Sequence, residues 1–168
     1  PEERGSFLKF CSIIENRNLT EFNYRISNEA LANVFVGIQV KNKDEGQAVM
    51  KNLKRGGFLV TDLTRDEISK LHIRHMVGGR SQLATNERLY RFEFPERPGA
   101  LMKFLSAMNT GWNISLFHYR NHGSDIGRIL VGLQVPSNEI NSLNRFIKSL
   151  GYNYKNETKN TAYNLFLK

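Results

Sequence analysis

Two similar turns in the chain contain the residue types that can bind a carboxylate. Residues 1–10 read PEERGSFLKF, and residues 95–104 read PERPGALMKF. In each turn a glycine precedes a predicted helix, whose first backbone N–H groups have no partner within the helix and attract anions. The candidate donors share this position at a helix start: Gly5, Ser6, Phe7, Gly99, Ala100 and Leu101. Many folds need glycine at such a turn, so the turns alone do not establish a ligand site.

The other polar residues do not form a pattern typical of catalysis. His72 and His75 lie three apart on a predicted strand and face opposite sides, while His118 and His122 span a strand and its turn. No carboxylate or thiol joins them at ligand spacing, so no metal site is predicted. There is also no G-x-S-x-G motif, no P-loop and no recognisable pyridoxal lysine motif. We therefore expect no enzymatic activity from this chain alone.

Composition indicates a globular protein. The chain has 168 residues, of which 40% are hydrophobic and 11% aromatic, and a formal net charge of +8. No apolar run is long enough to span a membrane, and the only cysteine, Cys11, cannot form an intramolecular disulfide. These features predict a cytoplasmic protein. Because the chain begins with Pro1 inside a repeated unit, we also interpret it as a fragment of a longer polypeptide.

The similarity of the two turns extends into a duplicated domain. Residues 22–25 read FNYR and residues 117–120 read FHYR; residues 36–40 and 131–135 differ at a single position. An ordered match of this kind indicates a repeat. We predict two subdomains, residues 1–80 and 81–168, joined at the Gly-Gly-Arg-Ser segment 78–81.

The hydrophobic pattern gives each copy the same order of elements. In the second copy we predict strands at 89–94, 114–120 and 129–135, helices at 101–108 and 140–150, and a final strand from Tyr152. Asn121-His122-Gly123-Ser124 supplies a hairpin turn. This β-α-β-β-α-β order predicts an α+β, ferredoxin-like fold in which antiparallel sheets carry helices on one face.

The first copy repeats most of these elements. Its predicted helices lie at 7–14 and around Val49 and Leu53, and its strands at 19–24 and 34–40. Its opening strand would precede Pro1, which predicts an exposed sheet edge or a gap. Between the copies, residues 64–67 have capping-box spacing and predict a short helix, and residues 71–77 are interpreted as an extra strand.

These elements and three particular segments resemble a known family. The order of elements and both turns look like ACT domains, small modules that bind amino acids and regulate metabolic enzymes. Segments 71–80 (LHIRHMVGGR), 92–96 (FEFPE) and 112–120 (WNISLFHYR) are similar to the carboxyl-terminal regulatory region of biosynthetic threonine dehydratase, also called threonine ammonia-lyase. The resemblance covers essentially the whole chain, but the family's catalytic domain has no counterpart in it.

The resemblance implies a function for the chain. In that family two ACT-like subdomains bind isoleucine as the feedback inhibitor and valine as its antagonist. A separate catalytic domain uses pyridoxal phosphate to convert threonine to 2-oxobutanoate and ammonia, in isoleucine biosynthesis. The chain is then a regulatory domain with no cofactor of its own, and its partners are the two amino acids, the catalytic domain and the other subunits of a tetramer.

The resemblance also suggests the effector-binding residues. Strand residues two apart share a face, so Phe22 with Tyr24, and Phe117 with Tyr119, can contact an aliphatic side chain. Gly5, Ser6, Phe7, Gly99, Ala100 and Leu101 then complete the effector sites. Arg25 and Arg120 point to the opposite face and are predicted to couple the subdomains. Because the second copy has its opening strand and the fuller Arg97-Pro98-Gly99 turn, we expect tighter binding there.

Two alternatives remain open from the sequence. RNA-recognition domains share the β-α-β-β-α-β order and suit a basic chain, but their aromatic third-strand signature is absent. A regulatory ACT pair from another pathway, binding phenylalanine or serine, is the nearer alternative. The segment at residues 112–120 argues against it.

Overall fold

The second copy folds in the predicted order. A computed structural model describes the chain except for residues 16, 97–99, 109–110, 122 and 124. The elements of this copy follow one another as β3 (Glu87–Pro95), α4 (Ala100–Ala107), β4 (Asn113–Arg120), β5 (Ile126–Gln134), the short 3-10 turn η2 (Ser137–Glu139), α5 (Ile140–Leu150) and β6 (Asn153–Asn156). Gly151 ends α5 in the left-handed conformation, which glycine adopts without steric cost. Parts of the predicted turns at 97–99 and 121–124 lie outside the described residues.

The first copy contains the matching helices and central strands. These are α1 (Ser6–Ile14), β1 (Leu19–Arg25), β2 (Val34–Ile38) and α2 (Lys43–Arg55). Asn42 caps α2 by accepting a hydrogen bond from the Glu45 backbone N–H, and Val49 and Leu53 form the buried stripe of the helix. The periodicity of the sequence therefore predicted these four elements correctly.

All strands of the described chain belong to one six-stranded antiparallel sheet. Its order is β2-β1-β4-β5-β3-β6, so the two expected sheets are joined where β1 pairs with β4. Within the second copy the order β4-β5-β3-β6 is that of a ferredoxin-like fold. β2 is an edge strand of this sheet, and Val34 in it is 41% exposed.

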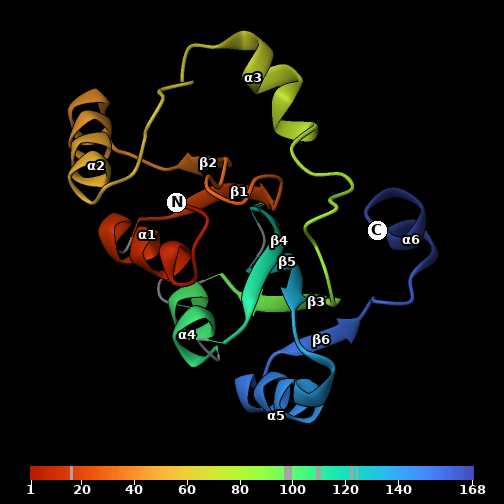
Figure 1. The fold of residues 1–168 in the computed structure, drawn as a ribbon. Helices are drawn as coiled ribbons and strands as arrows, with labels where there is room; N and C mark the ends of the chain where they lie inside the picture. The colour runs from red at the N-terminus through yellow and green to blue at the C-terminus, as the bar shows by residue number, and fades with distance from the viewer. Residues whose placement is uncertain (16, 97–99, 109–110, 122, 124) are drawn as a thin grey trace.

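The helices divide between the two faces of the sheet. Helices α1, α2, α4 and α5 cover one face, and α3 (Glu67–Leu71) and α6 (Thr161–Phe166) lie on the other (Figure 1). The main core fills the first face and includes Phe92, Phe104, Phe117 and Leu143, all fully buried. A smaller cluster on the opposite face joins Leu89 and Leu116 to Tyr163 of α6.

The extra strand expected at residues 71–77 is wrong. Helix α3 is followed there by a 3-10 turn, η1 (Ile73–His75). The backbone groups of this segment form hydrogen bonds with nearby residues and not with a neighbouring strand. His72 N–H donates to Ile68 O at 2.9 Å, and Met76 N–H donates to Ile73 O at 2.9 Å. A short helix does form here as predicted, but it begins later than the capping box at 64–67 indicated, because Asp66 rather than Thr64 caps it by accepting from the Ser69 N–H.

Helix α6 was not predicted from the sequence. Its cap is Asn160, whose side chain accepts from the backbone N–H groups of Ala162 and Tyr163. An asparagine before a short apolar run is a signal for a helix start. Tyr163, which is 3% exposed, anchors the helix by packing against Leu89 and Leu116 of the sheet.

Candidate functional site

The two copies meet through their equivalent strands. In the β1–β4 pair, Phe22 lies opposite Tyr119 and Tyr24 lies opposite Phe117. Since Phe22 corresponds to Phe117 and Tyr24 to Tyr119 in the repeat, this register relates the strands by a local two-fold axis. Opposed residues of an antiparallel pair share a face. All four aromatic side chains are buried beneath the helices, so they do not form the open stacking surface of an RNA-binding sheet.

A tyrosine–glutamate hydrogen bond recurs in both copies. The Tyr119 hydroxyl donates to Glu96, at 2.8 Å from Oε1 and 2.9 Å from Oε2. The Tyr24 hydroxyl donates in the same way to Glu2 Oε2. Burial raises the pKa of each tyrosine hydroxyl, and the accepting carboxylate raises it further, so both hydroxyls remain protonated donors at neutral pH. The repeated turns therefore place a carboxylate against the tyrosine of the neighbouring strand.

The hydrogen-bonded pair Tyr119 and Glu96 lies in the wall of a cavity of about 190 Å³, which we term the second cavity. Its walls come from both copies. Those that matter for ligand chemistry are the apolar Cys11, Ile14, Leu101 and Ile129, the charged Glu15, Arg17 and Glu96, and Ala100 and Tyr119. A carboxylate, a guanidinium and an aliphatic surface thus border one small space.

Two of the three charged side chains of the second cavity, Arg17 and Glu96, are held in place, and the third, Glu15, forms an ion pair with Arg17 at 3.6 Å. Arg17 Nε donates to Glu45 Oε1 at 3.1 Å, and Nη1 donates to the Ile14 carbonyl at 3.1 Å. Glu96 lies against Gly127 of β5, where an added Cβ would come 2.5 Å from Oε1. Glycine at position 127 therefore leaves room for the Glu96 carboxylate.

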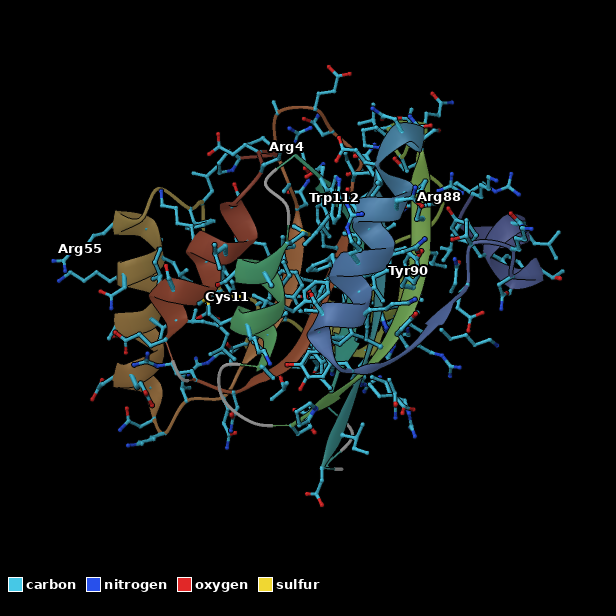
Figure 2. The ribbon with its side chains drawn as sticks, turned by 90° about the horizontal axis from the view of Figure 1, so that it is seen from below. Arg4, Cys11, Arg55, Arg88, Tyr90 and Trp112 are labelled. Atoms are coloured by element: carbon cyan, nitrogen blue, oxygen red, sulfur yellow. The ribbon has the colours of Figure 1, made fainter. Side chains whose placement is uncertain are left out.

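Cys11 closes one side of the second cavity and lies where α1 approaches α4 (Figure 2). Its side chain is 5% exposed, and burial raises the pKa of its thiol to about 12. A thiol with such a pKa is neutral at physiological pH. Cys11 therefore contributes an apolar surface to the cavity and no charge.

The hydrogen-bonded pair Tyr24 and Glu2 borders a larger cavity, of about 330 Å³, which we term the first cavity. Gly5, Ser6, Phe7, Phe22 and Tyr24 line it, and the second copy contributes Leu105, Met108, Trp112 and Ile114. Helix α1 begins here with Gly5 in the left-handed conformation, at φ 85°, and without a side-chain cap. The buried Ser6 Oγ has no hydrogen-bond partner among the described residues. The first cavity thus combines apolar walls with polar groups that a ligand can engage.

The structure separates the predicted residues into these two cavities, with two exceptions. Phe117 lines neither cavity; it packs edge-on against Phe7 and Phe22, with ring centroids 4.8 and 5.5 Å away. Gly99 lies outside the described residues. Three further candidate residues were not predicted from the sequence: Glu2, Glu96 and Arg17. The two glutamates follow a proline in both repeated turns and could have been found there, whereas Arg17 has no such signal.

The predicted coupling residues lie on the opposite face of the sheet. Arg25 forms a buried ion pair with Glu87 of the second copy, and it donates to the carbonyls of Gly79, at 2.9 Å, and Leu167, at 2.6 Å. Glu87 also accepts from Ser115 and, at 2.6 Å, from the Tyr163 hydroxyl. Arg120, in contrast, lies across from Glu21 in the β1–β4 pair.

In the described part of the chain, neither a metal-binding group of side chains nor a lysine in the two cavities is found. No three His, Cys, Asp or Glu side chains of these residues are grouped so that they could hold a metal ion. No lysine lines either cavity, so neither provides the amine to which pyridoxal phosphate attaches. In the same described residues, none of the helices combines the length and the apolar character needed to cross a membrane.

The fold is that of tandem ferredoxin-like, ACT-like subdomains joined through β1 and β4. The family model of the C-terminal regulatory domain of threonine dehydratase matches residues 1–73 and 78–167. The chain belongs to this family.

Individual relatives agree with this membership. The biosynthetic L-threonine dehydratase IlvA of Burkholderia multivorans is 59% identical over 99% of the chain, and that of Escherichia coli K12 is 48% identical over 99%. The mitochondrial threonine dehydratase of Saccharomyces cerevisiae is 43% identical over the whole chain. The chain spans 33%, 32% and 31% of these relatives, respectively, which is about a third of each.

Proposed function

We propose that the chain senses branched-chain amino acids, with isoleucine as inhibitor and valine as antagonist. The supporting observation is the composition of the second cavity. An amino acid carries an ammonium group, a carboxylate and a side chain, and the cavity provides Glu96, Arg17 and an aliphatic surface within one small space. Charge-assisted hydrogen bonds to both ends of the ligand fix its orientation.

In this proposal Glu96 binds the ammonium group and Arg17 the carboxylate. The aliphatic side chain lies against Leu101, Ile14 and Ile129. The small volume and aliphatic walls favour isoleucine or valine over phenylalanine. The first cavity offers Glu2, the uncapped start of α1 and Ser6 Oγ as corresponding polar groups, and we propose it as a second, weaker site because it is larger and less complementary to a small ligand.

For the whole polypeptide we propose the activity named in its relatives. A catalytic part, separate from the present residues, converts threonine to 2-oxobutanoate and ammonia with pyridoxal phosphate, and the polypeptide assembles as a tetramer. The boundary between the two subdomains is placed between residues 80 and 81. The regulatory domain changes the rate of the catalytic part through a difference in effector affinity between two conformations.

A melting assay with the twenty amino acids tests the sensing proposal. A ligand at about 100 times its Kd stabilises the folded state by about 2.7 kcal/mol, which raises Tm by roughly 5–10 °C for a chain of this size. We expect this increase with isoleucine and valine and none with phenylalanine or serine. Glu96→Gln is the matched variant and should reduce the response to that of the weaker first cavity. An increase caused only by phenylalanine, by serine or by mixed RNA would refute the proposal.

A further inference from the structure

The face of the sheet opposite the cavities carries an unusual concentration of exposed apolar side chains. Of the 13 large hydrophobic side chains that are exposed in the described chain, five lie in α3, η1 and α6, and a sixth, Met76, directly follows η1. They are Ile68, Leu71, Ile73, Met76, Leu165 and Phe166. Leu71 is 64% exposed and Met76 73% exposed. Concentrations of this kind mark interaction surfaces more often than single exposed residues do.

These segments are anchored to the sheet through polar side chains. Arg74 of η1 forms an ion pair with Glu21 of β1, and Asn23 of β1 donates to the Arg74 carbonyl at 3.2 Å. Arg25 donates to the Gly79 carbonyl, and Arg80 donates to the Leu165 carbonyl at 2.5 Å, which links the segment to α6. The apolar side chains of α3 and η1 are therefore presented to solvent from a segment that is held in place.

The anchoring residues alternate with residues of the effector face. Tyr24 borders the first cavity. Its neighbours Asn23 and Arg25 point to the other face of the sheet, where they form hydrogen bonds with the segment that contains η1. Because neighbouring strand residues point to opposite faces, a displacement of β1 moves both surfaces together. The layer formed by α3 and η1 is thus mechanically linked to the strand that joins the two copies.

We propose that the exposed surface of α3 and η1 docks against the catalytic part of the same polypeptide. This inference rests on the proposed regulatory function. The chain belongs to a family of regulatory domains, and its relatives are about three times as long as this chain. A catalytic part in the same polypeptide would therefore offer a large surface close to α3 and η1. The net charge of +8 disfavours a second copy as the occupant. Residues 64–80 carry four basic and two acidic side chains, but Arg74 is already paired with Glu21, so the complementary partner surface is mainly apolar.

Two leucine substitutions in the full-length polypeptide test the docking. Leu71→Glu places a charge on the proposed surface, and Leu31→Glu is the matched control, because Leu31 is 50% exposed in the connection between β1 and β2. We expect Leu71→Glu to reduce the effect of isoleucine on threonine deamination at least tenfold, while the isoleucine Kd stays within twofold. Leu31→Glu should retain the full response. A full response in Leu71→Glu overturns the docking surface.

Hydrogen exchange tests the same contact without an effector. Backbone amides of residues 67–76 should exchange at least tenfold more slowly in the full-length polypeptide than in this chain, and Leu71→Glu should abolish the difference. Equal exchange rates of residues 67–76 in the full-length polypeptide and in this chain overturn the docking, whether or not isoleucine binds. A failure of isoleucine to bind refutes only the sensing proposal. If sedimentation shows that this chain dimerises and that Leu71→Glu makes it monomeric, the surface binds a second copy instead, and the inference is wrong.

Discussion

Tyr119 and Glu96 are the residues on which the sensing proposal depends most directly. The hydroxyl fixes the carboxylate at 2.8 and 2.9 Å, and Gly127 leaves space for it on the neighbouring strand. The Tyr24–Glu2 pair repeats this arrangement in the larger first cavity. Equivalent substitutions in the Tyr119–Glu96 and Tyr24–Glu2 pairs therefore allow the second and first cavities to be compared directly.

Replacing either tyrosine by alanine should reveal which site binds the effector more tightly. A hydrogen bond to a charged group contributes about 1.5–3 kcal/mol, so Tyr119→Ala should weaken isoleucine binding roughly ten- to a hundredfold. Tyr24→Ala should have a smaller effect, because its cavity is larger and less complementary to the ligand. Isothermal titration of both variants measures the difference. A larger loss in Tyr24→Ala would move the principal site to the first copy.

Cys11 offers a chemical probe of the second cavity. With its thiol pKa raised to about 12, only on the order of one thiol in ten thousand is ionised at pH 8, so alkylation by iodoacetamide should be slow. The rate should rise about tenfold per pH unit as the thiolate fraction grows, and isoleucine should slow it further by filling the cavity. Mass spectrometry follows the reaction. Labelling as fast as that of free cysteine, or unaffected by isoleucine, would contradict this placement.

At the scale of elements, the buried ion pair between β1 and β3 joins the two copies. The side chains of Arg25 and Glu87 are 4% and 3% exposed, and Glu87 fits against Gly132, where any Cβ would collide with it. Tyr163 attaches α6 to the same carboxylate. One cluster thus fixes β1, β3 and the C-terminal helix.

Removing one partner of this pair should destabilise the whole fold. Arg25→Met leaves the Glu87 charge buried without its cation, which typically costs about 3–5 kcal/mol of the free energy of unfolding. The double variant Arg25→Met with Glu87→Gln should lose less than the sum of the two single variants, because no charge remains buried. Urea denaturation gives these values. A loss below about 1 kcal/mol in Arg25→Met would show that the pair is not important for stability.

Elements that depend on local periodicity were predictable from the sequence. The helices α1, α4 and α5 and the strands β3 and β4 follow their hydrophobic patterns. The strand expected at residues 71–77 was wrong because a short apolar alternation does not distinguish a strand from consecutive turns. The β1–β4 pairing was not predicted, because it depends on contacts between distant parts of the chain.

The candidate site was predictable to a similar extent. The repeat led to Tyr24, Tyr119 and the turns, and the structure places them at cavities. The role of Arg17 depends on helix α1 of one copy approaching α4 of the other, and no local pattern encodes that contact. Phe117 was assigned to a pocket from its strand face alone, but its ring is enclosed by two other aromatic rings.

At the scale of the whole molecule, each cavity has walls from both copies. A ligand in either cavity therefore contacts residues on both sides of the β1–β4 junction. An effector that prefers one arrangement of the copies can shift the equilibrium between arrangements, and coupling energies of about 1–3 kcal/mol are typical of such systems. Isoleucine and valine differ by one methylene, so opposite effects require that this methylene favours one arrangement.

Competition between isoleucine and valine is the most direct test of this account. One methylene in an apolar pocket contributes about 1–3 kcal/mol, so the second cavity cannot exclude valine. In calorimetric titrations of this chain, saturation with valine should therefore weaken the apparent affinity for isoleucine, and the two affinities should differ by roughly 5- to 150-fold. Independent binding of both amino acids at separate saturable sites, with no competition, would contradict the shared cavity and assign one copy to each amino acid.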